Sequence, residues 1–112
     1  DNLSCSYPWS IYYDSSEEIA GFQFDIDGEI NVINVSGGIV SSSGFMLSTG
    51  NNRVLGFHLG GEYIPSGNDL FISLNIVGNG VPCISSEGFI FSSMSGNQLE
   101  ASINNCNTII IP

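Results

Sequence analysis

The sequence contains no lysine and only one basic residue, Arg53, against eleven acidic side chains, which leaves a formal net charge of −10. Nucleic acids and anionic membranes attract proteins through basic patches, so this charge balance excludes both as partners. The missing lysines also exclude Schiff-base chemistry and a lysine general base. Only 11% of the residues are charged, so we expect serine, asparagine, glycine and threonine to cover much of the surface.

Side chains for acid–base catalysis are also scarce. His58 is the only histidine, and no Gly-x-Ser-x-Gly segment is present to hold a nucleophilic serine. Strict alternation predicts that Phe57 and Leu59 face the core, and that His58 faces outward or lies at an edge between sheets. Most of the carboxylates fall in turn-like segments. We therefore predict that the protein is not an enzyme and uses no cofactor.

Long hydrophobic runs are absent as well. No stretch approaches the roughly 20 apolar residues that cross a bilayer, so no membrane span is predicted. The chain starts at Asp1, without an initiator methionine or the basic and apolar segments of a signal peptide, so we expect a mature, processed chain or a fragment. Its 112 residues correspond to one domain.

The chain does contain short stretches in which every second residue is apolar, separated by glycine, asparagine, serine and proline. The clearest of these stretches are residues 20–27 and 69–77. Eight to ten of them follow one another at a spacing of roughly 10 residues. This pattern predicts an all-β fold, an immunoglobulin-like antiparallel β-sandwich of about eight or nine short strands.

Several small motifs refine this prediction. Asp27-Gly28 predicts a two-residue hairpin turn that returns the chain as a strand at residues 29–35. The sequence TGNN at residues 49–52 predicts another turn between strands, whereas the glycine- and serine-rich residues 36–44 are expected to be loops. Gly-Phe recurs four times, and we interpret each glycine as relieving crowding where a phenylalanine enters the core. The four phenylalanines are Phe22, Phe45, Phe57 and Phe89.

The N-terminus carries a strand pattern with aromatic residues, although chain ends often fray. Pro8 divides this stretch because proline has no N–H for a strand ladder. In one interpretation, residues 3–7 and 9–14 form a split first strand that changes sheets at Pro8. In the other, residues 1–8 are an extension of a domain at residues 9–112 and complete the sheet of a neighbouring copy. The donor-strand anchors would then be Leu3, Cys5, Tyr7 and Trp9.

The chain has three cysteines, and none lies in the Cys-x-x-Cys spacing that a zinc site would favour, so we expect disulfide chemistry of an oxidising compartment instead. An odd number predicts one disulfide with a remaining thiol, or a bond between chains. Cys83 and Cys106 each lie beside turn-rich sequence near the end of a predicted strand, so we predict that they pair and that Cys5 remains. An extracellular location, secreted or at the cell surface, follows from this prediction.

Two further candidate sites lie on polar residues. Asp25 and Asp27 project from the same face of a strand about 7 Å apart, and together with Glu29 they are a weak candidate for calcium. They match only part of a calcium-loop motif, and the alternative is a hairpin with a solvated acidic face. Asn2 and Asn34 each begin an Asn-x-Ser glycosylation sequon, so surface glycans are also expected if the source glycosylates its surface proteins.

Residues 19–106 resemble a known group of proteins. The segments AGFQFDID, SSSGFMLSTGN and RVLGFHLGGEYIPSGNDLFISL, with the region around Cys83, are similar to secreted β-sandwich proteins of aquatic bacteria that have a cohesin-like or immunoglobulin-like fold. The group includes subunits of pilus-like helical fibrils whose N-terminal strand is donated to another protomer. The resemblance implies that residues 1–7 are a donor strand and that Cys83 and Cys106 form an internal disulfide. The chain is shorter than a cohesin and shows no recognisable dockerin-facing surface.

Two functions therefore compete at the level of sequence. The first is a structural protomer of an extracellular homopolymer, whose partners are copies of itself and whose joints are donated strands. The second is a monomeric cell-surface module that is cohesin-like or binds carbohydrate. In that case the aromatic residues Trp9, Tyr12 and Tyr63 would be candidate sugar platforms, provided that they are exposed and coplanar.

Overall fold

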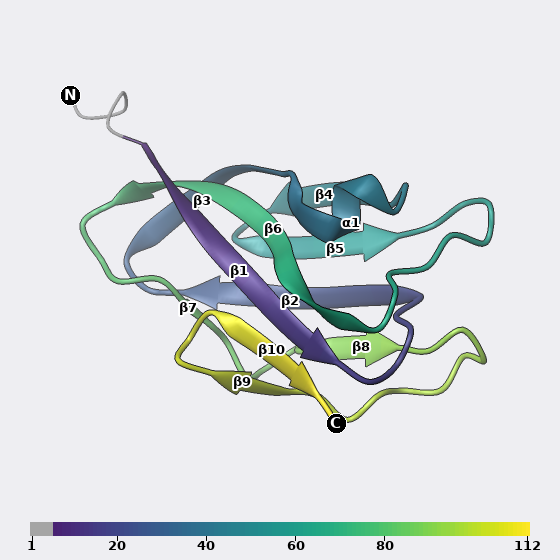
Figure 1. Ribbon diagram of the computed structural model, residues 1–112. Helices are drawn as coiled ribbons and strands as arrows, with labels where there is room; N and C mark the ends of the chain where they lie inside the picture. The colour runs from purple at the N-terminus through teal and green to yellow at the C-terminus, as the bar shows by residue number, and fades with distance from the viewer. Residues whose placement is uncertain (1–5) are drawn as a thin grey trace.

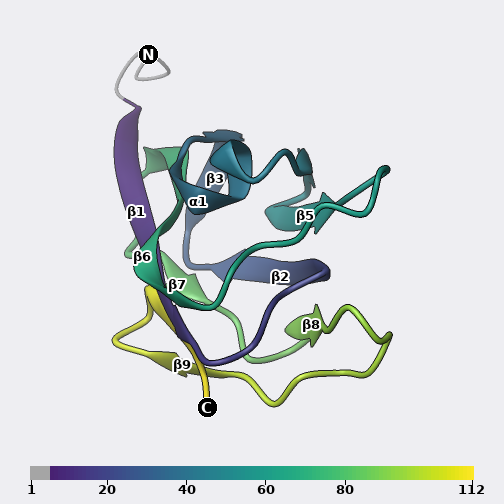
Figure 2. The same ribbon diagram turned by 45° about the vertical axis from the view of Figure 1, so that its right-hand side comes forward.

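The computed structural model describes residues 6–112 as two five-stranded β-sheets packed face to face. Sheet 1 contains, in spatial order, β3 (Ile30–Ser36), β6 (Gly67–Gly78), β1 (Tyr7–Ser15), β10 (Thr108–Ile111) and β9 (Ser102–Asn104). Sheet 2 contains β4 (Met46–Gly50), β5 (Arg53–Phe57) and β2 (Gly21–Asp27), and β2 also pairs with both β7 (Cys83–Ile84) and β8 (Ile90–Ser92). Figure 2 shows β1 and β6 in one layer and β5, β2 and β8 in the other. The predicted β-sandwich is confirmed.

Strand pairing is antiparallel with one exception in the described part of the chain. β1 and β10 run parallel, with Tyr12 beside Thr108 and Ser15 beside Ile111. Figure 1 shows the two strands side by side, pointing in the same direction. No helix among residues 6–112 is long and apolar enough to cross a membrane.

The core is built from the alternate residues that each sheet turns inward. Phe22 on β2 lies among other buried rings, with ring centroids 4.9 Å from Phe71 and 5.7 Å from Phe91. Gly56 on β5 lies directly opposite Phe22, and a side chain there would overlap the Phe22 ring. The interpretation of Gly-Phe as a core signal holds for Phe22 and Phe45, which are both buried.

The same interpretation is wrong for Phe57. β5 turns Val54 and Gly56 inward, so Phe57 faces solvent. Leu59 is also exposed, which contradicts the expected inward direction of both residues. His58 is half-buried instead, with its ring centroid 6.2 Å from that of Phe45 and its Nδ1 accepting a hydrogen bond from a backbone N–H. Alternation itself holds here, but its phase was wrong, because Val54 and Gly56 take the inward positions and Phe57 the outward one.

β1 runs without interruption through Pro8, so the predicted change of sheet at this residue is wrong. The strand pairs with β6 along its whole length, from Tyr7 opposite Ile76 to Ser15 opposite Gly67. Hydrogen-bonding groups along an antiparallel strand point alternately to its two sides, and an N–H at position 8 would point away from β6. Proline, which has no N–H, is therefore tolerated there. The expected boundary between an N-terminal extension at residues 1–8 and a domain at residues 9–112 therefore lies inside β1.

The turn at Asp27-Gly28 does not close a hairpin, because β2 lies in sheet 2 while β3 pairs with β6 in sheet 1. Gly28 has φ 117°, and a side chain there would overlap the backbone of Val81. The turn therefore carries the chain between sheets, and the hairpin prediction is wrong. The predicted turn between β4 and β5 is confirmed, with φ 54° at Asn51 and φ 62° at Asn52.

The stretch after β3, expected as a loop, contains the short helix α1 (Gly38–Ser42). Val40 is its buried residue, and the helix lies against β6. Gly38 approaches the Phe71 carbonyl so closely that a side chain would overlap it. The helix thus covers part of the core with Val40, and Ile39 packs against the core partly buried.

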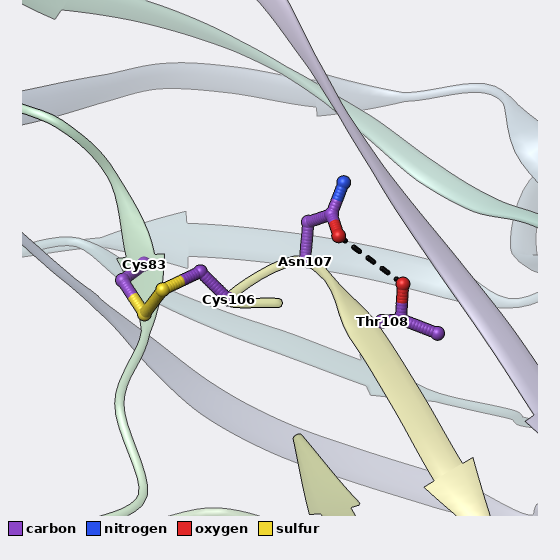
Figure 3. The surroundings of a disulfide bond; sticks show 4 residues. All are labelled: Cys83, Cys106, Asn107 and Thr108. Carbon is purple, nitrogen blue, oxygen red and sulfur yellow. Dashed lines mark hydrogen bonds between the residues drawn. A yellow bond between two sulfur atoms is a disulfide. The ribbon is translucent and has the colours of Figure 1, made fainter. Parts of the chain in front are cut away.

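The predicted disulfide between Cys83 and Cys106 is present (Figure 3). Cys83 belongs to β7 of sheet 2, whereas Cys106 lies in the turn between β9 and β10 of sheet 1. The Ile84 N–H also donates a hydrogen bond to the Cys106 carbonyl at 2.9 Å. The bond therefore joins the two sheets at one edge of the sandwich.

Candidate functional site

The outer face of sheet 2 carries large apolar side chains that have no cover within the described chain. They come from three different strands and are each between 37% and 48% exposed. We call this group the apolar face; its members are Met46, Leu55, Phe57 and Ile90. A contiguous exposed apolar group of this kind commonly marks an interaction site.

The strand register brings these four side chains together. Met46 on β4 lies directly opposite Phe57 on β5. Leu55, two residues before Phe57 and on the same side of β5, lies opposite Gln23 on β2, and Gln23 in turn pairs with Ile90 on β8. Alternation along each strand places all of these side chains on the same side of the sheet.

Gln23 lies between Leu55 and Ile90, and small residues occupy other outward positions around the apolar face. These small residues are Gly21 and Ser92, which pair across β2 and β8, together with Ser48 opposite Leu55 and Gly50 opposite Arg53. Because they have few bulky neighbours, the four apolar side chains project from a flat sheet surface. A flat face of this kind suits another protein surface better than a small molecule, which prefers an enclosed pocket.

An ion pair lies at one end of the apolar face. Arg53 and Asp25 are opposite one another on β5 and β2, and the guanidinium donates two hydrogen bonds to the carboxylate, Nε to Oδ1 at 2.8 Å and Nη2 to Oδ2 at 3.2 Å. This carboxylate raises the pKa of Arg53. The pair lines a shallow hollow of ≈ 300 Å³ with Gly50 and Asn51.

The other end lies beside the loop that follows β5. Glu62 in this loop accepts a hydrogen bond from the Gly60 N–H at 2.9 Å. Hydrogen bonds from its own backbone N–H and from that of Gly60 lower the pKa of the Glu62 carboxyl. The carboxylate thus holds the loop in place by accepting backbone hydrogen bonds.

The calcium candidates are not gathered into a metal site. Asp25 is engaged by Arg53, and among residues 6–112 there is no group of three His, Cys, Asp or Glu side chains that could hold a metal ion. Asp27 is exposed at the end of β2, and Glu29 follows the turn at Gly28. Because β2 and β3 belong to different sheets, the expected hairpin that would align Asp27 with Glu29 does not form.

The candidate donor-strand anchors divide into two groups. Tyr7 and Trp9 lie in β1, where they pair with Ile76 and Leu74 of the same chain and pack partly buried against the core. Leu3 and Cys5 lie outside the described residues, as does the sequon at Asn2.

The other predicted surface residues are dispersed over sheet 1 and the loops. Asn34, which begins the second sequon, is exposed on β3. Of the three candidate sugar platforms, Trp9 faces the core, Tyr12 is exposed on the outer side of β1, and Tyr63 is exposed in the loop between β5 and β6. These aromatic residues therefore do not form one shared platform.

Comparison with known proteins identifies the architecture. No protein-family model matches the chain, and no curated protein matches its sequence. Among solved structures, a chain of a crystal structure of a dockerin–cohesin complex (CaDoc0917 with CaCohA2) superimposes with a TM-score of 0.67 over 95% of this chain and 88% of its own length, at 12% identity. The fold is that of a cohesin-like β-sandwich.

Sequence reasoning missed the apolar face of this cohesin-like sandwich. Its four apolar residues come from β4, β5 and β8, three separate stretches that only the strand register brings together. The sequence signal that could have revealed this face is the Gly-Phe segment at Phe57. Since Val54 and Gly56 face the core, alternation along β5 leaves Leu55 and Phe57 facing solvent.

Proposed function

We propose that this cohesin-like sandwich is a non-catalytic protein-binding module and that the apolar face on sheet 2 is its docking surface. The observation that carries the proposal is the exposure of Met46, Leu55 and Phe57 at neighbouring positions of β4 and β5, with Ile90 beyond Gln23 on the same face of the sheet. Each of these side chains is already more than half buried, so covering its exposed part stabilises a complex by less than half of the full burial value, about 1 kcal/mol, before the costs of association.

The partner is a protein with an apolar patch rimmed by lysine or arginine. The net charge of −10 repels a second copy of this chain and attracts a basic surface. Asp25 and Asp27 project from β2 toward the same side as the apolar face, so basic rim residues would meet them there. The Asp25–Arg53 pair gives the face a polar end, which favours one orientation of the partner.

Dockerins are the first partners to test, because the structural neighbour is a dockerin–cohesin complex. The support is analogy at the level of the fold, since the two chains are only 12% identical. The experiment immobilises this protein and measures binding of CaDoc0917 and a set of other dockerins by biolayer interferometry.

The decisive variant is Leu55→Asp, which places a charge in the centre of the apolar face. The matched control is Ile33→Asp, which makes the same kind of change at an exposed apolar residue on β3 of sheet 1. We expect a dockerin that binds the protein to lose at least about tenfold in affinity with Leu55→Asp and nothing with Ile33→Asp. Equal binding by both variants would reject the apolar face, and no binding by any dockerin would reject this class of partner.

A fibril subunit joined by donated strands is the second candidate. One observation favours it: residues Tyr7–Ile11 of β1 pair with β6 on one side, while β10 accompanies only residues Tyr12–Ser15 on the other. Within residues 6–112 the free side of this half-strand receives only the side-chain amide of Asn107, at 3.5 Å from the Ser10 carbonyl. An open strand edge is where an extended segment of another copy could add.

Deleting residues 1–6 tests this second candidate while keeping β1. Electron microscopy and sedimentation would show filaments for the intact protein and none for the truncated one. If the intact protein stays monomeric at every concentration, the fibril function is wrong. For either function, the disulfide between Cys83 and Cys106 supports an extracellular location, because cytosolic conditions keep most thiols reduced.

A further inference from the structure

A second candidate surface lies on the opposite side of the sandwich, around Tyr12. This residue is on β1, the central strand of sheet 1, and its side chain is 45% exposed on the outer face. Tyr13, next in the chain, points the other way and is buried in the core. The Tyr12 ring is therefore held in place by a rigid strand paired on both sides, by β6 and by β10.

The strand register surrounds Tyr12 with a mixture of apolar and polar side chains. Tyr12 lies between Leu70 on β6 and Thr108 on β10. Asp14, two residues further along β1, lies between Asn68 on β6 and Ile110 on β10. These side chains line a shallow, open hollow of ≈ 530 Å³ over the middle of sheet 1.

The polar groups of this hollow are free to bind a ligand. Among residues 6–112, no protein hydrogen bond engages the Asp14 carboxylate, the Asn68 amide or the Tyr12 hydroxyl. Thr108 Oγ1 donates to Asn107 Oδ1 at 3.1 Å and still has lone pairs to accept a hydrogen bond. The Asp14 carboxylate, the Asn68 amide and the Thr108 hydroxyl thus lie around the exposed Tyr12 ring, which adds its own hydroxyl.

We propose that this hollow, formed by Tyr12, Asp14, Asn68 and Thr108, binds a neutral carbohydrate. A pyranose ring has an apolar face of C–H groups that packs against an aromatic side chain, and hydroxyls at its rim that hydrogen-bond to planar polar groups. Asp14 accepts hydroxyl hydrogens only, while the Asn68 amide both donates and accepts, so together they match adjacent sugar hydroxyls.

Charge narrows the class of sugar. Asp14 and Asp69 both line the hollow, and the whole chain carries a net charge of −10. These charges repel uronic acids and sulfated sugars, so the ligand is a neutral polysaccharide or oligosaccharide. The site is independent of the proposed docking surface, because it uses the outer face of sheet 1 and none of the residues of the apolar face on sheet 2.

Affinity electrophoresis tests the proposal with soluble polysaccharides cast into native gels. The neutral probes are hydroxyethylcellulose, xylan and galactomannan, and alginate is the anionic probe. We expect at least one neutral probe to retard the protein, Tyr12→Ala to weaken that binding at least about tenfold, and Tyr12→Trp to keep it. The matched control is Tyr63→Ala, which removes a similarly exposed tyrosine in a loop and leaves binding unchanged.

Two further variants, Asp14→Ala and Asn68→Ala, keep the aromatic ring and remove only hydrogen-bonding groups. We expect each to weaken binding, with a urea midpoint like that of the wild-type protein. Retardation by none of the neutral probes, or by alginate alone, would overturn the proposal, as would equal retardation of wild-type protein and Tyr12→Ala. Leu55→Asp is expected to bind the polysaccharide normally, which separates failure of this site from failure of the docking surface.

Discussion

The guanidinium of Arg53 forms two hydrogen bonds with the carboxylate of Asp25 across β5 and β2, at 2.8 Å and 3.2 Å. Arg53 is the only lysine or arginine of the chain, so the single strong cation is already paired. Among residues 6–112, every other carboxylate lacks a lysine or arginine partner. On the outer surface of sheet 2, Asp27 therefore adds uncompensated negative charge to the apolar face, which is the basis for expecting a basic partner.

The ion pair itself should add little to the stability of the fold. Both side chains are open to solvent, where screening weakens such pairs. We expect Arg53→Gln, which changes the net charge from −10 to −11, to shift the urea midpoint only slightly at low salt. In about 1 M NaCl, where the Debye length is about 3 Å, the difference should vanish. A large loss that persists at high salt would contradict this account.

The disulfide should contribute much more. Cys83 and Cys106 are 23 residues apart, and closing a loop of this size restricts the unfolded chain by about 3 kcal/mol. We expect the double variant Cys83→Ser with Cys106→Ser to lose about that much free energy of unfolding, measured by urea denaturation. If the double variant has the same urea midpoint as the wild-type protein, the bond does not restrain the fold as argued.

Gly56 is predicted to be intolerant of even one methyl group. A Cβ at this position would lie 2.3 Å from the Phe22 ring, in the middle of the aromatic core. Overpacking of this kind costs about 1–3 kcal/mol, so Gly56→Ala should lower the free energy of unfolding by that amount. Gly50→Ala is the matched control, because nothing lies within 4 Å of a Cβ there and its backbone conformation is open to other residues. Equal stability of the two variants would show that the Phe22 ring can move aside.

Tyr13 should make the fold sensitive to alkaline pH. Burial, and secondarily the charge of Asp69, raise the pKa of Tyr13 above its ordinary value of 10.0. The folded state therefore holds this proton more tightly than the unfolded state, so stability is complete below pH 10 and declines as pH rises through the folded pKa. Tyr13→Phe should reduce this decline in urea denaturation curves recorded above that pH.

The same variant has a second effect at neutral pH. The Tyr13 hydroxyl donates a hydrogen bond to the Pro65 carbonyl at 2.7 Å, and its loss should cost about 1 kcal/mol. Tyr12→Phe removes an exposed hydroxyl from the adjacent position and should leave stability at neutral pH unchanged. An unaltered alkaline decline in Tyr13→Phe would mean that another group titrates with unfolding.

Much of the sandwich was predictable because its strands carry a strong period of two. The segments that became β2 and β6 were recognised from their alternate apolar residues, such as Phe22 and Phe24 in β2 and Ile72 and Leu74 in β6. The cysteine pair was found from its position beside turns. The partners of the strands were not predictable in the same way. Asp27-Gly28 has the composition of a hairpin turn, yet Gly28 packs against the Val81 backbone and sends the chain to the other sheet.

The candidate sites depend on register more than on composition. Leu55 and Phe57 have the same apolar character as core residues, and only the inward direction of Val54 and Gly56 shows that they face solvent. Tyr12 and Asn68 are 56 residues apart in sequence, and pairing between β1 and β6 brings them to the same hollow. No local pattern contains that information, because it arises from long-range strand pairing.

The parallel pairing of β1 and β10 also determines how the domain would carry a mechanical load. β1 is the first strand and β10 the last, and they lie side by side pointing the same way (Figure 1). Tension applied through the two ends of the domain would slide one strand along the other. The hydrogen bonds from the Tyr12 N–H to Asn107 and from the Ser16 N–H to Ile111, at the two ends of this ladder, would then be strained together rather than one after another. Such a shear geometry resists extension far better than a pair of strands that can unzip, so we expect forced extension of the domain to require breaking this ladder as a whole.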